Sequence, residues 1–148
     1  MAGIRKDLLT DQWIVTDTKS ENVFLESIEG LKPKTKIKCI FCPGSEENTL
    51  PEIFSVREPG TQPNKPGWSV RVFPSMHAAM KIEGEVSRKA VGMYDAMNNI
   101  GAHELIVETP EHIKNICDLS IEQIKKVLNV YQIRINDLRN DERLRYCL

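Results

Sequence analysis

The fold is decided by two neighbouring stretches, Glu104-Leu105-Ile106-Val107-Glu108 and Ser120–Leu138. The first has the apolar, partly β-branched composition of a half-buried strand. The second predicts an amphipathic helix over about residues 121–139, because Ser120 and Gln123 have the spacing of a capping box. One face of this helix collects the apolar residues Ile121, Ile124, Val127, Leu128, Tyr131, Ile135 and Leu138. Such a stripe has to pack on a sheet, so the two stretches predict an α+β fold.

Two further segments have the pattern of strands. Residues 12–16 are aromatic and β-branched, and in residues 68–73 the side chains of Trp68, Val70 and Val72 alternate with polar ones. The segments between the strands predict loops, of which the second is rich in proline: 17–38, 43–67 and 81–97. We therefore expect an antiparallel sheet with the amphipathic helix packed on it.

The C-terminal residues have the alternation with which a strand begins. Leu144, Tyr146 and Leu148 alternate with arginine and cysteine side chains, and no turn follows them. This pattern fits a natural terminal strand, and it equally fits a chain that is cut short inside a strand. Periodicity alone cannot separate these two interpretations.

The composition excludes several classes of protein. The 148 residues carry 20 basic and 21 acidic side chains, and 41% are hydrophobic, which suffices for one sizeable core. The net charge of −1 and the 6% of aromatic residues leave no footprint for nucleic acid or an anionic membrane. No apolar run approaches the roughly 20 residues of a membrane helix, and the N-terminus lacks a secretory signal. We expect a cytoplasmic protein with one domain over residues 1–148, and no nucleic-acid or membrane partner.

The pair Cys39 and Cys42 is the most informative local motif. Two-residue spacing lets both thiolates face one tetrahedral ion, while the tight turn offers backbone N–H groups to the sulfurs. A redox pair would be expected at the start of a helix, whereas here Pro43 and Gly44 follow and no helical pattern begins. The motif therefore favours half of a structural zinc site.

The remaining zinc ligands have to come from elsewhere in the chain. His112 lies just past the predicted strand and His103 lies just before it, and either could instead be a surface histidine. Cys117 and Cys147 are more typical of small hydrophobic residues than of ligands. Spacing alone leaves the choice between His103 and His112 open.

No sequence motif for a catalytic centre is present. The chain contains no Gly-x-Ser-x-Gly, no phosphate-binding Walker loop, no Gly-x-Gly-x-x-Gly and no paired-histidine helix motif. The residues by themselves thus indicate a soluble α+β protein with a zinc knuckle and no visible nucleophile.

Taken in order, the motifs resemble the N-terminal half of the galactose-1-phosphate uridylyltransferase family, nucleotidyltransferases of the histidine triad superfamily. Residues 5–15 resemble its opening Arg-x-Asp…Thr-Gly-x-Trp-Val motif, and 39–52 are similar to its Cys-Pro-Phe-Cys-Pro-Gly-Asn-Glu…Thr-Pro-Pro-Glu stretch. The most specific match is Gly101–His112, and the amphipathic helix with the Asp141…Arg145-Tyr146 ending also follows the family. The resemblance covers nearly the whole chain.

This resemblance implies a histidine-triad-like half-barrel and a zinc site in which Cys39, Cys42 and His112 are three of four ligands. In the family, a histidine attacks the α-phosphorus of UDP-glucose, which forms a uridylyl-enzyme and releases glucose 1-phosphate, and galactose 1-phosphate then takes the uridylyl group. That nucleophile and the fourth zinc ligand lie in a His-x-His-x-Gln motif, beyond the strand that Leu148 begins. The resemblance therefore implies a C-terminally truncated domain with no catalytic residue of its own, inactive alone, and a homodimer if full length.

The sequence also departs from the family near the expected nucleotide. An arginine-rich stretch has become residues 17–22 without arginine, and Ser75 stands where the family has asparagine. Ser75 can still form hydrogen bonds to a substrate, and Phe41 and Phe73 can pack on the base, although core packing explains both rings equally well. An ADP-sugar phosphorylase fits the remaining motifs nearly as well. The sequence is also compatible with a non-catalytic zinc-binding module and with a zinc-free degenerate fold.

Overall fold

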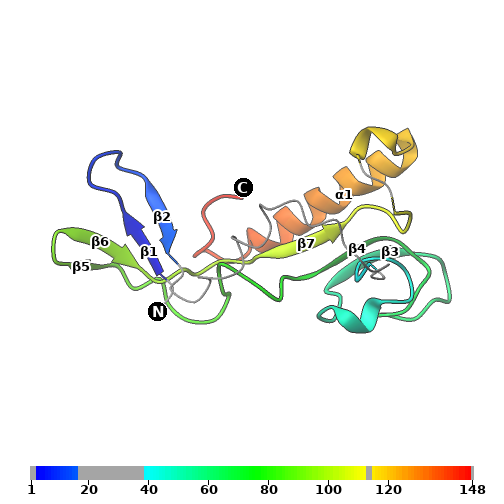
Figure 1. The fold of residues 1–148 in the computed structure, drawn as a ribbon, viewed down its shortest axis with the longest axis horizontal. Coiled ribbons are helices and arrows are strands. Elements are labelled where there is room, and N and C mark those ends of the chain that lie inside the picture. The colour runs from blue at the N-terminus through cyan, green and yellow to red at the C-terminus, as the bar shows by residue number, and fades with distance from the viewer. Residues whose placement is uncertain (1–2, 17–38, 113–114, 148) are drawn as a thin grey trace, which may run out of the picture. The chain divides into compact units, whose positions relative to one another are not determined.

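The computed structural model describes residues 3–16, 39–112 and 115–147. The chain forms two compact units (Figure 1), the first from residues 1–37 and 79–102 and the second from 38–78 and 103–148. The loop predicted over residues 17–38 lies outside the described residues. The single domain expected over residues 1–148 stays a prediction.

The first unit contains an antiparallel four-stranded sheet in the order β2-β1-β6-β5. Its strands are β1 (Gly3–Lys6), β2 (Trp13–Thr16), β5 (Lys89–Val91) and β6 (Tyr94–Met97). Strand β2 confirms the prediction for residues 12–16. Strands β5 and β6 instead replace part of the loop expected over 81–97, because Gly92, with φ of 62°, permits a tight hairpin between them.

The second unit contains an antiparallel three-stranded sheet in the order β3-β4-β7, together with the helix. Its elements are the 3₁₀ turn η1 (Glu46–Asn48), β3 (Phe54–Arg57), β4 (Trp68–Pro74), β7 (Glu104–Val107), the 3₁₀ turn η2 (Ile116–Asp118) and α1 (Ile121–Leu138). Strands β4 and β7 and the helix confirm the sequence predictions, and the Ser120 hydroxyl accepts the predicted capping bond from the Gln123 N–H at 3.2 Å. Strand β3 was missed because it lies between prolines. Among the described residues, no helix has both the length and the apolar character needed to cross a membrane.

Helix α1 packs on one face of the β3-β4-β7 sheet (Figure 1). The centre of this core consists of four fully buried valines: Val70, Val72, Val127 and Val130. The predicted stripe was wrong in two members, since Ile121 is 68% and Leu128 is 56% exposed. Hydrogen bonds from Gln123, Tyr131 and Arg134 to the sheet turn the helix toward Val130 instead.

A β-bulge in β4 determines on which face of this sheet Trp68 lies. Val70 pairs with Val56, but Trp68 pairs with Arg57, so β4 has one extra residue at this point. Paired residues share a face, and the extra residue therefore turns Trp68 away from the helix and toward the side of Arg71 and Phe73. The alternation predicted for Trp68, Val70 and Val72 does not extend to Trp68, although its side chain is buried.

The structure has no strand at residues 144–147, so the strand predicted to begin at Leu144 is wrong for the described residues. The Leu144 N–H donates to the Asp141 carbonyl at 2.9 Å, and Asp141 forms an ion pair with Arg143. These contacts make a turn rather than extended backbone. Alternating side chains form a strand only where a neighbouring strand supplies hydrogen bonds.

Candidate metal centre

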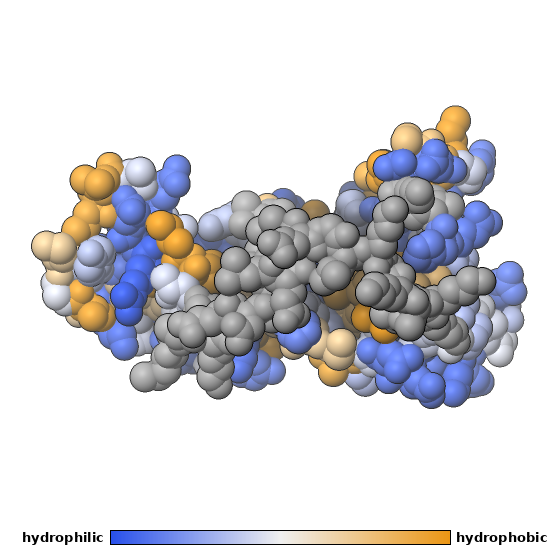
Figure 2. All heavy atoms as spheres, in the orientation of Figure 1, coloured by the Kyte–Doolittle hydropathy of each residue, from blue (hydrophilic) through white to orange (hydrophobic). Residues whose placement is uncertain are grey.

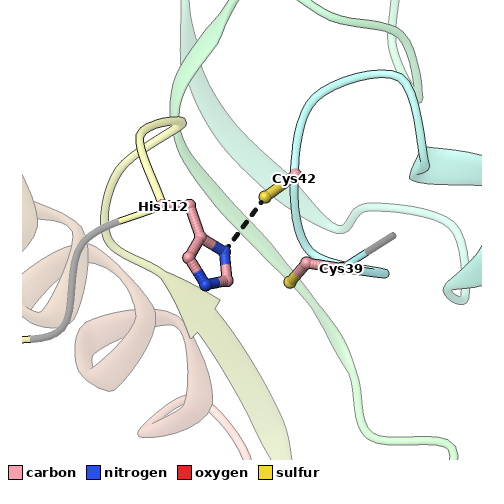
Figure 3. A group of neighbouring side chains, drawn as sticks. All are labelled: Cys39, Cys42 and His112. Carbon is pink, nitrogen blue, oxygen red and sulfur yellow. Dashed lines mark hydrogen bonds between the residues drawn. The ribbon is translucent and has the colours of Figure 1, made fainter. Parts of the chain in front are cut away.

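Cys39, Cys42 and His112 form a close group in the second unit (Figure 3). One ligand atom from each residue lies within 4.8 Å of the others, and the Cys42 Sγ is 3.3 Å from the His112 Nδ1. Both cysteines are half-buried, whereas His112 is exposed. Residues 70 positions apart in the sequence thus meet at one point.

The two cysteines and His112 lie on different turns of the chain. The cysteines lie on a turn in which the Cys42 N–H donates to the Cys39 carbonyl at 3.3 Å and the Ser45 N–H donates to the Cys42 carbonyl at 3.1 Å. His112 follows strand β7, after a turn in which the Glu111 N–H donates to the Thr109 hydroxyl at 3.2 Å. The cysteine turn, residues 39–45, is called the metal loop below.

A buried carboxylate lies at the end of the metal loop. Glu46 is only 6% exposed and accepts hydrogen bonds from the Gly44 N–H at 2.9 Å and from the Trp68 Nε1 at 2.8 Å. Burial would raise the pKa of Glu46, but the bond from Trp68 and those from backbone N–H groups outweigh it and lower the pKa. The carboxylate is therefore ionised at neutral pH and serves as an acceptor.

The donor set matches the chemistry of a zinc ion. Two thiols and one imidazole are the ligands that structural zinc sites use, and the group could hold a metal ion. His103 is exposed and outside this group, and its carbonyl accepts a hydrogen bond from the Ser75 N–H at 2.8 Å. Cys117 and Cys147 are exposed thiols, also outside the group. Of the two histidines that spacing left open, the structure brings His112 to the cysteines.

A pocket of about 340 Å³ lies beside the group. Its walls include the three candidate ligands, Phe41, residues 105–107 of β7 and the turn after it, and Ile116 and Leu119. Most of its lining is apolar, and Glu108, Thr109, Glu111 and Asn115 are among its polar members.

The three predicted substrate-contacting residues lie in different surroundings. Phe41 is 39% exposed and lines the pocket, whereas Phe73 is 1% exposed and stacks on Phe41 with ring centroids 6.1 Å apart. Ser75 follows β4 and does not line the pocket, and its hydroxyl accepts a hydrogen bond from the His77 N–H at 3.3 Å. The structure thus brings Phe41 and Phe73 together, and a role for the three in binding substrate stays a prediction.

Sequence reasoning missed a buried ion-pair network on the face of the β3-β4-β7 sheet that lies opposite helix α1. The Arg71 side chain is 2% exposed, and Glu52 bonds to both Arg71 and Arg57, at 3.1 and 2.9 Å. The Arg71 Nη1 also donates to the Thr49 hydroxyl at 2.8 Å, and its guanidinium lies 4.7 Å from the Phe73 ring centroid. The arginine within the strand predicted over residues 68–73 is the signal that could have revealed this network.

Comparison with known proteins extends these observations. No protein-family model matches the chain. It is similar to an ADP-glucose phosphorylase from Arabidopsis thaliana, with 27% identity over 154 residues, covering 97% of this chain and 41% of that protein. A solved uridylyltransferase structure matches with a TM-score of 0.67 and 23% identity, covering 97% of this chain and 37% of that one.

The fold of this chain is similar to that of the matching part of the solved uridylyltransferase. The resemblance expected from the motifs, to the N-terminal part of the galactose-1-phosphate uridylyltransferase family, is confirmed. An ADP-glucose phosphorylase from Arabidopsis thaliana, crystallised with bound ADP-glucose, has a similar fold at a TM-score of 0.56 and 22% identity, covering 99% of this chain and 41% of that one. The chain therefore spans about two fifths of the length of these uridylyltransferase-like relatives, whose names denote transferases and phosphorylases.

Proposed function

We propose that this chain is the metal-binding, N-terminal part of a cytoplasmic UDP-glucose–hexose-1-phosphate uridylyltransferase of galactose metabolism. The observation that carries the proposal is the close grouping of Cys39, Cys42 and His112 in a chain with the uridylyltransferase fold. The substrates would be UDP-glucose and galactose 1-phosphate, and the complete enzyme would be a homodimer.

The proposed metal is zinc, held by two thiolates and one imidazole. All four cysteines and all three histidines of the sequence are among the described residues, and only three of these seven side chains gather. A fourth ligand would therefore be a carboxylate, a water molecule or a donor from outside this chain. Zinc with such ligands contributes to the folding of the protein around it.

Metal analysis of the purified protein tests the zinc site. We expect close to one zinc per chain, lost in Cys39→Ser and in His112→Ala because each removes a ligand atom. His103→Ala is the matched control, since His103 is an exposed histidine outside the group. Full zinc content in His112→Ala, or equal loss in His103→Ala, would contradict the assignment.

The nucleotide is proposed to contact Phe41, Phe73 and Ser75. The exposed part of the Phe41 ring is available to stack on a base, and the Ser75 hydroxyl offers one polar contact. Titration with UDP-glucose, followed by calorimetry, tests this. We expect weaker binding in Phe41→Ala and stronger binding in Ser75→Asn, because an amide supplies a donor and an acceptor together. Unchanged affinity in both variants would remove Phe41 and Ser75 from the site.

The chain is proposed to be inactive alone. Its sequence contains no His-x-His-x-Gln motif, so it lacks the histidine that would form the uridylyl intermediate. Incubation with UDP-glucose should therefore leave the protein mass unchanged and release no glucose 1-phosphate. A covalent uridylyl adduct, or any turnover with galactose 1-phosphate, would overturn this part of the proposal.

An ADP-sugar phosphorylase is the second candidate function. It is favoured by the 27% identity to an ADP-glucose phosphorylase over 97% of this chain. UDP-glucose and ADP-glucose differ only in the base, so competition between them isolates recognition of the base. Tighter binding of UDP-glucose supports the uridylyltransferase proposal, and tighter binding of ADP-glucose supports the phosphorylase.

A further inference from the structure

The metal loop contains turn hydrogen bonds from the Cys42 and Ser45 N–H groups to the Cys39 and Cys42 carbonyls. Turn bonds within the loop do not by themselves define where both sulfurs lie relative to His112, which belongs to another segment. Ligands that are held in place before the metal arrives bind it more tightly, because less conformational entropy is lost on binding.

Two side-chain contacts join the loop to strand β4. The first starts inside the Cys39–Cys42 turn, where the Phe41 ring stacks on Phe73 at an interplanar angle of 28°. Phe73 is itself held by the Arg71 guanidinium, which Glu52 fixes through a buried ion pair. The ring between the two cysteines is therefore fixed to the buried interior of the unit.

The second contact lies at the other end of the loop. The Glu46 carboxylate receives the Gly44 N–H on one oxygen and the Trp68 indole N–H on the other. The β-bulge makes this contact possible, because it turns Trp68 to the side of the sheet on which Arg71 and Phe73 lie. Gly44 has φ of 82°, which allows its N–H to turn toward this carboxylate.

Strand β4 is also the neighbour of the segment that carries His112. It pairs with β7 from Arg71↔Val107 to Pro74↔Glu104, and His112 follows five residues after β7 ends. The same strand thus contacts residues in and next to the metal loop through side chains, and it pairs through backbone hydrogen bonds with the strand that precedes His112.

We propose that Phe73 and Trp68 are positioning residues for the metal site, and that β4 sets the distance between the two cysteines and His112. The positioning role rests on the proposed function, in which these three residues bind a metal ion. Neither Phe73 nor Trp68 is a ligand. Each acts through a residue in or next to the metal loop, Phe73 through Phe41 and Trp68 through Glu46.

Cobalt binding to the full chain provides the test, because Co²⁺ bound to thiolates gives an absorption band that reports the ligands directly. The variants are Phe73→Leu, which removes the ring stack, and Trp68→Phe, which removes the indole N–H and part of the ring but keeps an aromatic side chain. We expect each to weaken Co²⁺ binding about tenfold, at the lower end of the effect of losing an outer-shell contact. The control is Val130→Ala, which lies in the helix-facing core and lowers stability without touching the loop.

The comparison of variants separates positioning from folding. Phe41→Ala breaks the same ring stack from its half-exposed side, so it tests the contact even if Phe73→Leu fails to fold. In the double variant Phe41→Ala/Phe73→Leu, the losses of cobalt affinity should be less than additive, because both remove one contact.

Each outcome has a distinct meaning. If the unaltered chain binds no Co²⁺, the proposed metal site and the positioning role both fail. If it binds Co²⁺ and Phe73→Leu, Trp68→Phe and Phe41→Ala bind equally well, only the positioning role fails. The role also fails if Val130→Ala weakens cobalt binding as much as they do.

Discussion

The sheets of the two units differ in what covers their faces. In the β3-β4-β7 sheet, Val70 and Val72 are fully buried against α1, and Arg71 and Phe73 on the other side are 1% exposed. In the β2-β1-β6-β5 sheet, only Ile4 and Ala96 are buried among the described residues, and Figure 2 shows apolar side chains at the surface of this unit. Similar strands thus carry a core in one unit, whereas few side chains are buried among the described strands of the other. The candidate metal group lies in the unit whose sheet is covered on both faces.

Replacing the buried carboxylate of the covered sheet should have the largest effect. Glu52→Gln leaves Arg57 and Arg71 without their counterion in a site where the Glu52 side chain is 5% exposed. Breaking a buried ion pair from one side costs about 3–5 kcal/mol of unfolding free energy. Urea unfolding measures this loss, and Glu52→Asp, which keeps the charge, should lose less. A loss below about 1 kcal/mol would show that the network is not a main support of this unit.

Truncating one apolar side chain in each unit compares the two units directly. Val130→Ala should lower the unfolding free energy by about 2 kcal/mol, because it opens a cavity in a fully buried cluster. Ile14→Ala in β2 should lower it by less than about 0.5 kcal/mol, because Ile14 is 47% exposed. Both values come from urea unfolding of the full chain. Equal losses would mean that the first unit is better covered than its exposed side chains indicate.

Tyr131 gives the covered sheet a pH dependence. Burial, followed by the hydrogen bond to the Glu108 carboxylate at 2.6 Å, raises the pKa of Tyr131 from 10.0 to about 12. A pKa raised on folding adds stability that is fully present below pH 10 and is lost as the pH rises through 12. Tyr131→Phe should therefore cost about 1 kcal/mol at neutral pH and flatten the fall in unfolding free energy between pH 10 and 12. An unchanged alkaline profile in the variant would assign that fall to other groups.

A small effect is also expected for the exposed ion pair of the first unit. The Lys6 Nζ lies 2.5 Å from Asp11, whose side chain is 83% exposed. Asp11→Asn should change the unfolding free energy by at most about 1 kcal/mol, because water and salt screen exposed charges. Asparagine also tolerates the φ of 60° found at residue 11. A loss near that of Glu52→Gln would erase the contrast between the units.

The local sequence pattern predicted those strands and the helix whose apolar side chains follow a clear period. Strands β2, β4 and β7 and helix α1 follow from such patterns, and the capping residue Ser120 follows from its spacing to Gln123. Strands β1, β5 and β6 were missed because each contains at most two large apolar side chains, and β3 was missed because it lies among prolines. The strands that they pair with, which a local pattern does not reveal, decide such short strands.

Part of the candidate site also follows from the sequence, and part of it depends on the fold. Cys39 and Cys42 follow from two-residue spacing, whereas the choice of His112 over His103 required either a family resemblance or a structure. The β-bulge at Trp68 and the burial of Arg71 depend on long-range pairing with β3 and on residues 49–52. Neither can be derived from the order of residues within β4 alone.

The hydrogen bond between the Ser75 N–H and the His103 carbonyl brings together two residues that lie far apart in the sequence. Residues 76–102 therefore begin and end at two hydrogen-bonded residues, and they form an insertion between the segment that carries the cysteines and the one that carries His112. The distance in space between Cys42 and His112 is therefore independent of the length of this insertion. Insertions or deletions within it would change the numbering of the candidate ligands without moving them apart, as expected of a modular segment.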